Sequence, residues 1–177
     1  SVSSAASDVY KRQDLVPTAN EESHGTAISG TQDGPTNSDI GTDSFIYDYT
    51  VSDGLALKAA YKPSKSGGLD SSTEIGIQYT GMTGLTVSAA MGENNAAADQ
   101  IDLTVFSANY STGPMSFGIQ VNDTSHSTSS NNEDFTAYGV SYQVNDDVSL
   151  SYGVSAIDYA DATKEDQESS AVSASFT

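Results

Sequence analysis

Two histidines and several acidic runs are the side chains in this sequence that could act as a base or bind a metal. His24 and His126 lie far apart in polar stretches, and no serine or acid is spaced to make either a general base. The runs at 131–134 and 146–147 offer the oxygen ligands that Ca²⁺ prefers, but neither matches an EF-hand or a repeat-type calcium loop. We interpret the runs as acidic turns and the histidines as solvated loop residues. We therefore expect no enzyme activity and no cofactor.

The charge and cysteine content exclude several other classes. Six Lys and Arg stand against 24 Asp and Glu, giving a net charge of −18, so a nucleic-acid partner is not expected. The absence of cysteine excludes a disulfide scaffold and a thiolate metal site. No stretch approaches the ~20 apolar residues of a membrane helix, although membrane β-strands are only mildly hydrophobic on average. Two classes remain: a secreted acidic β-protein, or a β-barrel with a polar lumen.

The elements that must position these side chains are β-strands. From Ser44 onward apolar residues occupy alternate positions, as in strands whose two faces meet different surroundings. Nine strands are predicted, over 44–52, 54–62, 72–80, 84–92, 100–111, 114–123, 134–144, 148–158 and 169–177. In the fifth, the apolar parity shifts at Val105 and Phe106. We expect a β-bulge there, because one extra residue re-aims the side chains.

The connections between the predicted strands alternate in length. Short turns lie near 52–54, 80–84, 111–114 and 145–147, and longer polar connections at 63–71, 93–99, 123–133 and 159–168. A membrane barrel needs this alternation, because its turns lie at one membrane surface and its loops at the other. A soluble sandwich has no reason to sort its loops by length. The predicted strand lengths also match tilted membrane strands of about 9–11 residues.

The apolar face would contact lipid in a barrel but a second sheet in a sandwich. The ten tyrosines, many of them toward strand ends, suit the headgroup level of a membrane, although tyrosine is also a common strand former. The candidates for the lipid-facing side are Phe45, Tyr47, Leu57, Ile77, Phe117 and Leu150. The candidates for the opposite side, facing water in the lumen, are Asp48, Lys58, Glu74, Gln78, Asp102 and Gln120.

One stretch carries a resemblance to a known family. Phe45-Ile-Tyr-Asp-Tyr-Thr-Val-Ser-Asp-Gly-Leu-Ala-Leu-Lys-Ala-Ala-Tyr, followed by an acidic loop and Glu74-Ile-Gly-Ile-Gln-Tyr, resembles the general porins of alphaproteobacteria. The likeness covers 14–177 and rests on the order of long loop, strand, short turn and strand. It implies a homotrimeric barrel of about sixteen strands in the outer membrane. Such a barrel contacts lipid and lipopolysaccharide and passes small hydrophilic solutes and ions by passive diffusion.

The resemblance also suggests a division of the chain. Residues 44–177 would form the transmembrane strand meander. Residues 14–43 would correspond to the pore-constricting loop, with Glu21, Glu22, Asp33 and Asp39 as candidates; the alternative is a plain surface loop or a disordered segment.

Residues 3–13 read Ser-Ser-Ala-Ala-Ser-Asp-Val-Tyr-Lys-Arg-Gln, which resembles the translation of a transposon-based sequencing adaptor. We assign 1–13 to such an artefact and expect natural sequence to begin near Asp14, in mid-gene. Nine strands is an odd number, whereas bacterial single-chain barrels use even numbers. We therefore expect a partial up-and-down barrel that forms an open, curved sheet with a polar concave side.

Two questions stay open at the level of sequence. Acids outnumber lysines among the lumen candidates, and a negative lining would make the pore prefer cations. Alternatively, the acids of the loops only solubilise the outer surface and bind divalent ions between lipopolysaccharide molecules. The rival class, a secreted acidic β-sandwich for binding or adhesion, would gather Leu57, Ile77, Phe117 and Leu150 in one dry interior.

Overall fold

A computed structural model describes residues 45–64, 71–95 and 99–176. Nine strands and one short helix make up this part of the chain. The strands are β1 (Phe45–Ser52), β2 (Leu55–Lys62), β3 (Ser72–Met82), β4 (Leu85–Asn94), β5 (Ile101–Thr112), β6 (Met115–His126), β7 (Glu133–Asn145), β8 (Val148–Tyr159) and β9 (Gln167–Phe176). The 3₁₀ helix η1 (Ser129–Asn131) lies between β6 and β7.

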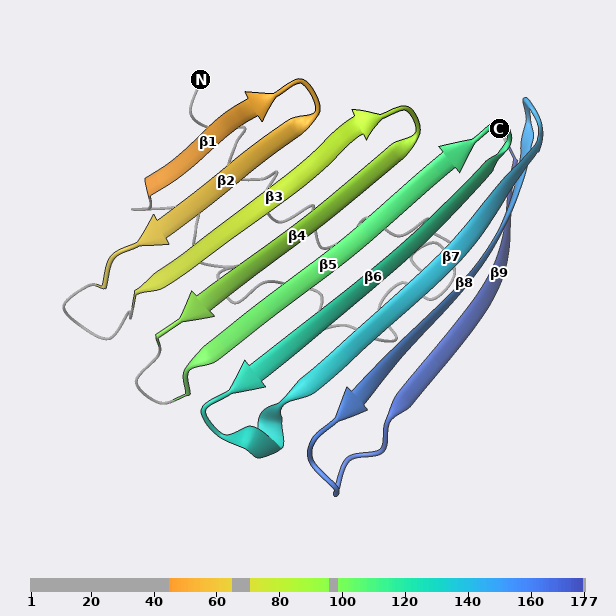
Figure 1. Cartoon of the computed structure of the whole chain (residues 1–177). Coiled ribbons are helices and arrows are strands. Elements are labelled where there is room, and N and C mark those ends of the chain that lie inside the picture. The colour runs from red at the N-terminus through yellow and green to blue at the C-terminus, as the bar shows by residue number, and fades with distance from the viewer. Residues whose placement is uncertain (1–44, 65–70, 96–98, 177) are drawn as a thin grey trace.

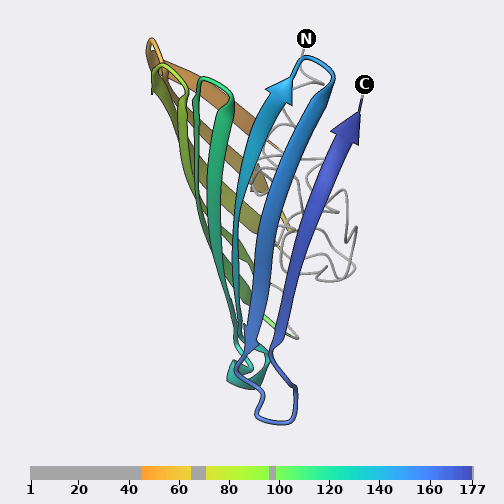
Figure 2. The same cartoon turned by 90° about the vertical axis from the view of Figure 1, so that its right-hand side faces the viewer.

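The nine strands form one sheet in which each strand pairs antiparallel with its neighbours in the chain, in the order β1 to β9. Figure 1 shows this meander from one face, and Figure 2, turned by 90°, shows that the sheet is curved. All two-residue turns lie along one edge and all longer connections along the other (Figure 1). The predicted all-β meander, its nine strands and its sorted loops are therefore confirmed, and two packed sheets are not what the described residues form.

The tight turns depend on backbone conformations that glycine adopts easily. Gly54, Gly84 and Gly113 have φ of +81°, +78° and +55°, a region that other residues enter at a cost. Each turn also accepts a hydrogen bond from the next hairpin: the Ser111 N–H donates to the Gly84 carbonyl at 2.8 Å. A Cβ at Gly84 would collide with the Ser111 carbonyl, whereas one at Gly113 would meet open space. The turn edge is thus fixed mainly by the backbone.

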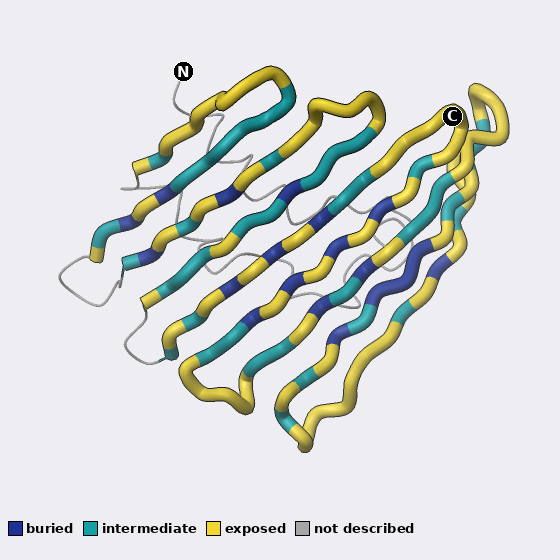
Figure 3. Tube along the Cα trace, in the orientation of Figure 1, coloured by how far each residue is buried: buried dark blue, intermediate teal, exposed yellow. Residues whose placement is uncertain are grey.

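The pairing register assigns every strand residue to one of two faces, because directly opposed residues point to the same side. Along β6, Ile119 is 42% exposed while its neighbour Gln120 is 2% exposed. A similar alternation runs along β3 and β5, as the changing colours of the tube in Figure 3 show, whereas β1 is exposed almost throughout. We call the shielded side, which carries Gln120, the inner face and assign it to the concave side, where converging side chains shield one another. The other side is the outer face.

The predicted β-bulge at Val105 and Phe106 is wrong. β5 pairs without a break with β4 and with β6 through both residues. The apolar parity shifts because Leu103 and Val105 are buried on the inner face whereas Phe106 lies exposed on the outer face. Register shifts occur instead beside the short turns, between Thr50 and Ser52 among other places.

Most strand bounds differ from the predicted ones by one or two residues. The largest difference is at β6, which continues to His126, beyond the expected end at 123, and β9 begins two residues earlier than expected, at Gln167. Within the described ranges, no helix has the length and apolar character needed to span a membrane. The constriction-loop candidates Glu21, Glu22, Asp33 and Asp39, together with His24 and the segment 1–13, lie outside the described residues.

Candidate functional site: the inner wall and its rim

The outer face carries the large apolar side chains. The lipid-facing candidates Phe45, Tyr47, Leu57, Ile77, Phe117 and Leu150 all lie on it by register. Leu57 is half-buried and the other five are exposed. The rings of Tyr47 and Tyr49 also stack, with centroids 6.1 Å apart and an interplanar angle of 11°. These residues therefore do not meet in a dry interior, which is what a sandwich required.

The boundary of the apolar surface on the outer face, which we call the apolar limit, runs obliquely across the strands. Toward the loop edge, the last large apolar residues on β2 to β9 are Tyr61, Ile75, Met91, Phe106, Val121, Tyr138, Val154 and Val172. Relative to the pairing register, this limit moves toward the turn edge by roughly one residue per strand. With ~3.3 Å per residue and ~4.8 Å between strands, the slope corresponds to a strand tilt of about 35–40°. Membrane barrels have strand tilts of about 35–45°.

Beyond this limit the outer face becomes acidic. Glu93 pairs directly with Asp102, and Asp134 lies between Asp123 and Asp158 on the neighbouring strands. The placement of Asp102 differs from the expectation that it faces the lumen. Because β5 contains no bulge, Asp102 keeps the parity of Phe106 and points outward.

The inner face places the other five lumen candidates on one wall. Asp48 and Lys58 are opposed on β1 and β2, and the Lys58 ammonium lies 3.5 Å from the Asp48 carboxylate. Glu74 lies on the same face of β3. The pairing shows that opposite charges partly neutralise each other at this end of the wall.

Amide and hydroxyl side chains continue the wall across β3 to β6. Gln78, Ser88, Ser107 and Gln120 are opposed in one row that crosses the four strands. The Gln78 side-chain amide donates to the Ser88 hydroxyl at 3.3 Å, and that of Gln120 donates to Asn122 Oδ1 at 3.1 Å. The wall therefore presents neutral hydrogen-bonding groups in its central part.

Sequence reasoning missed an apolar patch on the inner face. Phe135 and Ile157 are opposed on β7 and β8, are each 2% exposed, and pack with Ala137 and Tyr159. The sequence contained the signal, because both have the parity of polar inner-face residues such as Ser155. We call these four residues the inner apolar patch.

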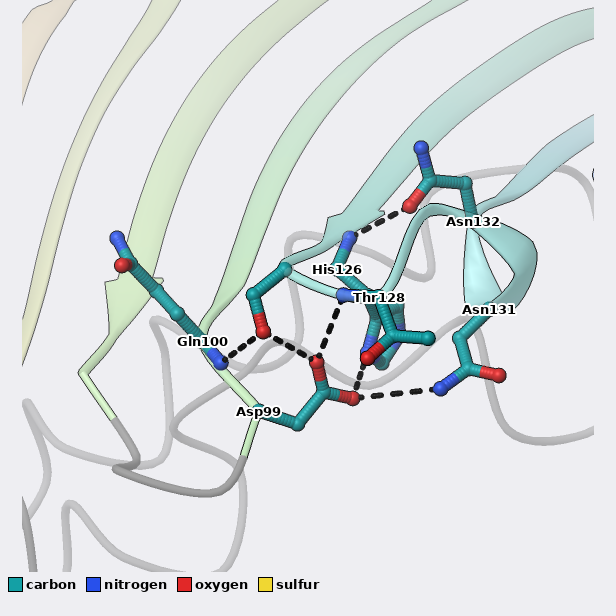
Figure 4. A network of polar contacts seen from close by, with 7 residues as sticks. Asp99, Gln100, His126, Thr128, Asn131 and Asn132 are labelled. Atoms are coloured by element: carbon teal, nitrogen blue, oxygen red, sulfur yellow. Dashed lines mark hydrogen bonds and ion pairs between the residues drawn. The ribbon is translucent and has the colours of Figure 1, made fainter.

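The connections at the loop edge, which we call the rim, are held by side-chain as well as backbone hydrogen bonds. Figure 4 shows Asp99, just before β5, at the centre of contacts with the β6–β7 connection. His126 Nδ1 lies 2.7 Å from Asp99 Oδ2, the Ser127 hydroxyl donates to Oδ1 at 2.8 Å, and the Thr128 N–H donates to Oδ1 at 3.3 Å. The Asn131 side-chain amide completes the set at 3.5 Å.

His126 is therefore not the solvated loop residue that the sequence suggested. It ends β6, and its side chain is 17% exposed, against 30% for Asp99. Its backbone N–H donates to Asn132 Oδ1 at 2.7 Å, which ties the strand end to the residue after η1. The Asp99 carboxylate orients the imidazole, and the Ser127 hydroxyl in the same network donates to that carboxylate.

Hydrogen bonds lower the pKa of two carboxylates at the loop edge of the sheet. The hydrogen bond from His126, followed by that from Ser127, holds the pKa of Asp99 at about 2. In the β8–β9 connection, hydrogen bonds from the Thr163 side chain and backbone lower the pKa of Asp161. Among the described residues, no group of three or more His, Cys, Asp or Glu is arranged to hold a metal ion.

A one-layer antiparallel meander with an apolar outer face, an oblique apolar limit and a polar inner wall defines the class of transmembrane β-barrels. A family profile described as Gram-negative porin matches residues 2–177, and the chain belongs to this family. The protein is accordingly a porin-like component of the outer membrane.

Two solved structures from Vibrio cholerae are similar to this chain. They are the outer membrane protein OmpT, folded in vitro, and a mutant of OmpT that lacks loop L8. OmpT has 18% sequence identity and a TM-score of 0.54, over 73% of this chain and 46% of that one. The mutant has 18% identity and a TM-score of 0.55, over 86% of this chain and 59% of that one.

At this identity the likeness shows the fold alone: an outer-membrane β-barrel. The chain spans about half the length of the barrels it matches. A search of curated proteins found no match.

Proposed function

We propose that this chain forms part of the wall of a water-filled channel through which small hydrophilic solutes and ions diffuse passively. The observation that carries the proposal is the pairing of faces: the same strands present apolar side chains outward and the row of Gln78, Ser88, Ser107 and Gln120 inward. A polar inner wall keeps water in a lumen, whereas lipid contacts the other side. Membership of the porin family favours a channel over an enzyme.

The test uses the full-length protein, because a barrel wall must be closed to exclude lipid. The purified protein is reconstituted in planar bilayers and in liposomes. We expect stepwise ohmic conductance, and liposome swelling whose rate falls as the test sugar grows larger. A correctly folded protein that neither conducts nor admits the smallest sugar would refute the channel.

We propose that the channel prefers cations, and only weakly so. On the inner face of the described strands, Asp48, Glu74 and Glu133 stand against Lys58 and Lys62, so the wall is close to balanced. The excess of acid over base lies elsewhere in the chain, which carries −18 in total. Acidic groups near a channel mouth raise the local cation concentration, and salt screens the effect over about 10 Å at 0.1 M.

Reversal potentials across a KCl gradient measure this preference. We expect a cation-selective potential that grows as the ionic strength falls, and Lys58→Met should increase it by removing a cation from the wall. Ser125→Met is the control, because Ser125 lies on the outer face beyond the apolar limit and the change removes no charge. Anion selectivity in the unmodified protein would contradict the proposal.

We propose further that residues 14–43 narrow the pore. The segment precedes β1 and is rich in acids, Gly, Ser and Thr. Deleting 20–35 from the full-length protein should raise the single-channel conductance, whereas deleting 162–164 should not. An unchanged conductance after the first deletion would rule out a narrowing role.

Lipid, lipopolysaccharide and two further copies of the chain are the partners we propose. The outward acids beyond the apolar limit, such as Asp123 and Asp158, lie where the headgroup region of the outer leaflet would begin. Light scattering of the detergent-solubilised full-length protein tests the trimer, and a monomer would contradict it.

A further inference from the structure

The connection between β8 and β9 forms an open hollow at the loop edge of the sheet. Its volume is about 510 Å³, and small-molecule sites in proteins have volumes of about 300–1,000 Å³. Its lining comes from the end of β8, the connection and the start of β9: Tyr159, Lys164, Glu165, Asp166 and Gln167. Tyr159 is opposed to Glu133 on the inner face, so the hollow lies on the lumen side of the rim. We call it the β8–β9 hollow.

The Tyr159 ring is held in place before any solute arrives. It packs against the other residues of the inner apolar patch. The Gln167 side-chain amide donates to the Tyr159 hydroxyl at 3.2 Å, and the Tyr159 backbone N–H donates to Asp166 Oδ1 at 2.9 Å. A group that is already fixed loses little freedom on binding, so the ring is a prepared surface for a ligand.

An ammonium group already lies on this ring. Lys164 Nζ is 5.0 Å from the centroid of the Tyr159 ring, within the range of a cation–π contact. A turn at Asp161 sets this position, because the Lys164 N–H donates to the Asp161 carbonyl at 2.9 Å and the Thr163 hydroxyl donates to Asp161 Oδ1 at 2.7 Å. The Lys164 side chain is exposed, so another cation can replace it without opening a buried contact.

The charges around the ring favour a cation as the ligand. Glu165 and Asp166 line the hollow together with Lys164. Glu133, opposed to Tyr159 on β7, interacts electrostatically with Lys164. Three carboxyl groups thus stand against one lysine. If the lysine side chain leaves the ring, a cationic solute meets attraction there and an anionic solute meets repulsion.

We propose that the β8–β9 hollow is a binding site for small organic cations, in which the ammonium group of the solute takes the place of Lys164 over the Tyr159 ring. Lys164 is then a tethered competitor that covers the ring while the site is empty. The lumen-side position puts the site beside the path of solutes into the barrel. A role in uptake rests on the proposed channel function, whereas binding itself does not and can be measured without current.

Binding of choline to the full-length protein in detergent is the first measurement, by saturation-transfer NMR with the signal of protein-free micelles subtracted. The matched neutral probe is dimethylbutanol, in which a carbon atom replaces the nitrogen of choline. We expect a saturable choline signal and a much weaker signal from the neutral probe, because only choline carries the charge that the ring attracts. The absence of choline binding, or equal affinity for the two probes, would overturn the site.

Two substitutions should change the affinity for choline in opposite directions. Lys164→Met removes the competitor and should raise the affinity about two- to fivefold, whereas Tyr159→Leu removes the ring and should lower it by a similar factor. Lys164→Arg keeps a cation over the ring and should not raise the affinity. Tyr152→Leu is the matched control for the ring, because Tyr152 lies on the outer face of the same strand, and it should bind as the unmodified protein does.

The lysine variant decides if Tyr159→Leu does not fold. Lys164→Met keeps every backbone hydrogen bond of the turn and changes only an exposed side chain. A lysine that merely shapes the connection would, when replaced, leave the affinity for choline unchanged or lower. Either of these results in Lys164→Met would overturn the site.

Single-channel recording is the second measurement. Choline added on the loop side of the bilayer should reduce the KCl current more than the neutral probe does, and Lys164→Met should lower the required concentration about two- to fivefold. A protein that conducts but does not respond to choline overturns the role of the site in uptake. A protein that forms no pore refutes the channel instead, and the NMR result then decides whether the site exists.

Discussion

The half of the sheet next to the tight turns and the half next to the loops distribute apolar residues in opposite ways. Near the turns, Phe117 and Ile119 point outward while Gln120 points inward. Near the loops, Asp134 points outward while Phe135 points inward. An apolar side chain goes where water is excluded, whichever face that is. The reversal along a strand therefore marks the place where contact with lipid ends.

Phe135→Ala should have the largest effect, because it removes a buried ring from the inner apolar patch. We expect a loss of about 3–5 kcal/mol in the unfolding free energy of the full-length protein, measured by urea titration in lipid vesicles. Phe106→Ala, on the outer face at the apolar limit, should cost less than about 1 kcal/mol. Equal losses would mean that the two faces do not differ as described.

Ile119→Arg should have the next largest effect. It places a charge in the middle of the apolar surface of β6 and should cost about 2–4 kcal/mol, whereas Ser125→Arg, on the same face beyond the apolar limit, should cost about 0–1 kcal/mol. The same titration measures both variants. A large cost for Ser125→Arg would move the end of lipid contact toward the loop edge.

Gly84→Ala tests how firmly the turn edge is fixed. A Cβ there combines an unfavourable φ with a collision with the Ser111 carbonyl, and we expect a loss of about 2 kcal/mol. Gly113→Ala has an unfavourable φ but open space, and about 1 kcal/mol is expected. If both variants cost the same, the close approach of neighbouring hairpins contributes nothing.

A double-mutant cycle with Asp48→Asn and Lys58→Met measures the ion pair on the polar part of the wall. The coupling energy should be about 0.2–1 kcal/mol and should shrink in high salt, because the pair is only partly shielded from water. A coupling that salt leaves unchanged would indicate a dry wall at this position.

Acid titration of Asp99→Asn should give the smallest effect. The pKa of Asp99 is depressed to about 2 in the folded protein, so its stabilising contribution is present above about pH 4 and is lost as the pH falls toward 2. The variant should therefore show a flatter loss of unfolding free energy over this window. Asp161→Asn is the control, because Asp161 accepts hydrogen bonds from Thr163 instead of a histidine. A difference between the two variants then measures what the contact with His126 adds to the effect of Asp99.

Much of the fold follows from local patterns. Alternating residues such as Val140 and Tyr142, and glycines at tight turns, depend only on neighbours in the chain, so the sequence alone located every strand. The apolar residues of β5 were misjudged because a single strand fixes parity but not which face its apolar residues occupy. Leu103 and Val105 needed the register of β4 and β6 to be placed.

The rim could not be predicted, for a different reason. Asp99 and His126 are 27 residues apart, and each looks like an ordinary polar loop residue in its own stretch. Only the pairing of β5 with β6 brings the two connections together. Five of the six candidates for the lumen side share the inner face because their positions follow from alternation, whereas the outward placement of Asp102 follows from the missing bulge.

The pairing of every strand with its neighbour in the chain has a consequence for how the protein assembles. Each hairpin can form after closing only a short loop, which keeps the entropic cost of every step low. The order in which strands leave the ribosome is then also the order in which they can dock, each onto the exposed edge of the previous one. Such a chain can grow its sheet by addition at one side, without waiting for distant segments to meet.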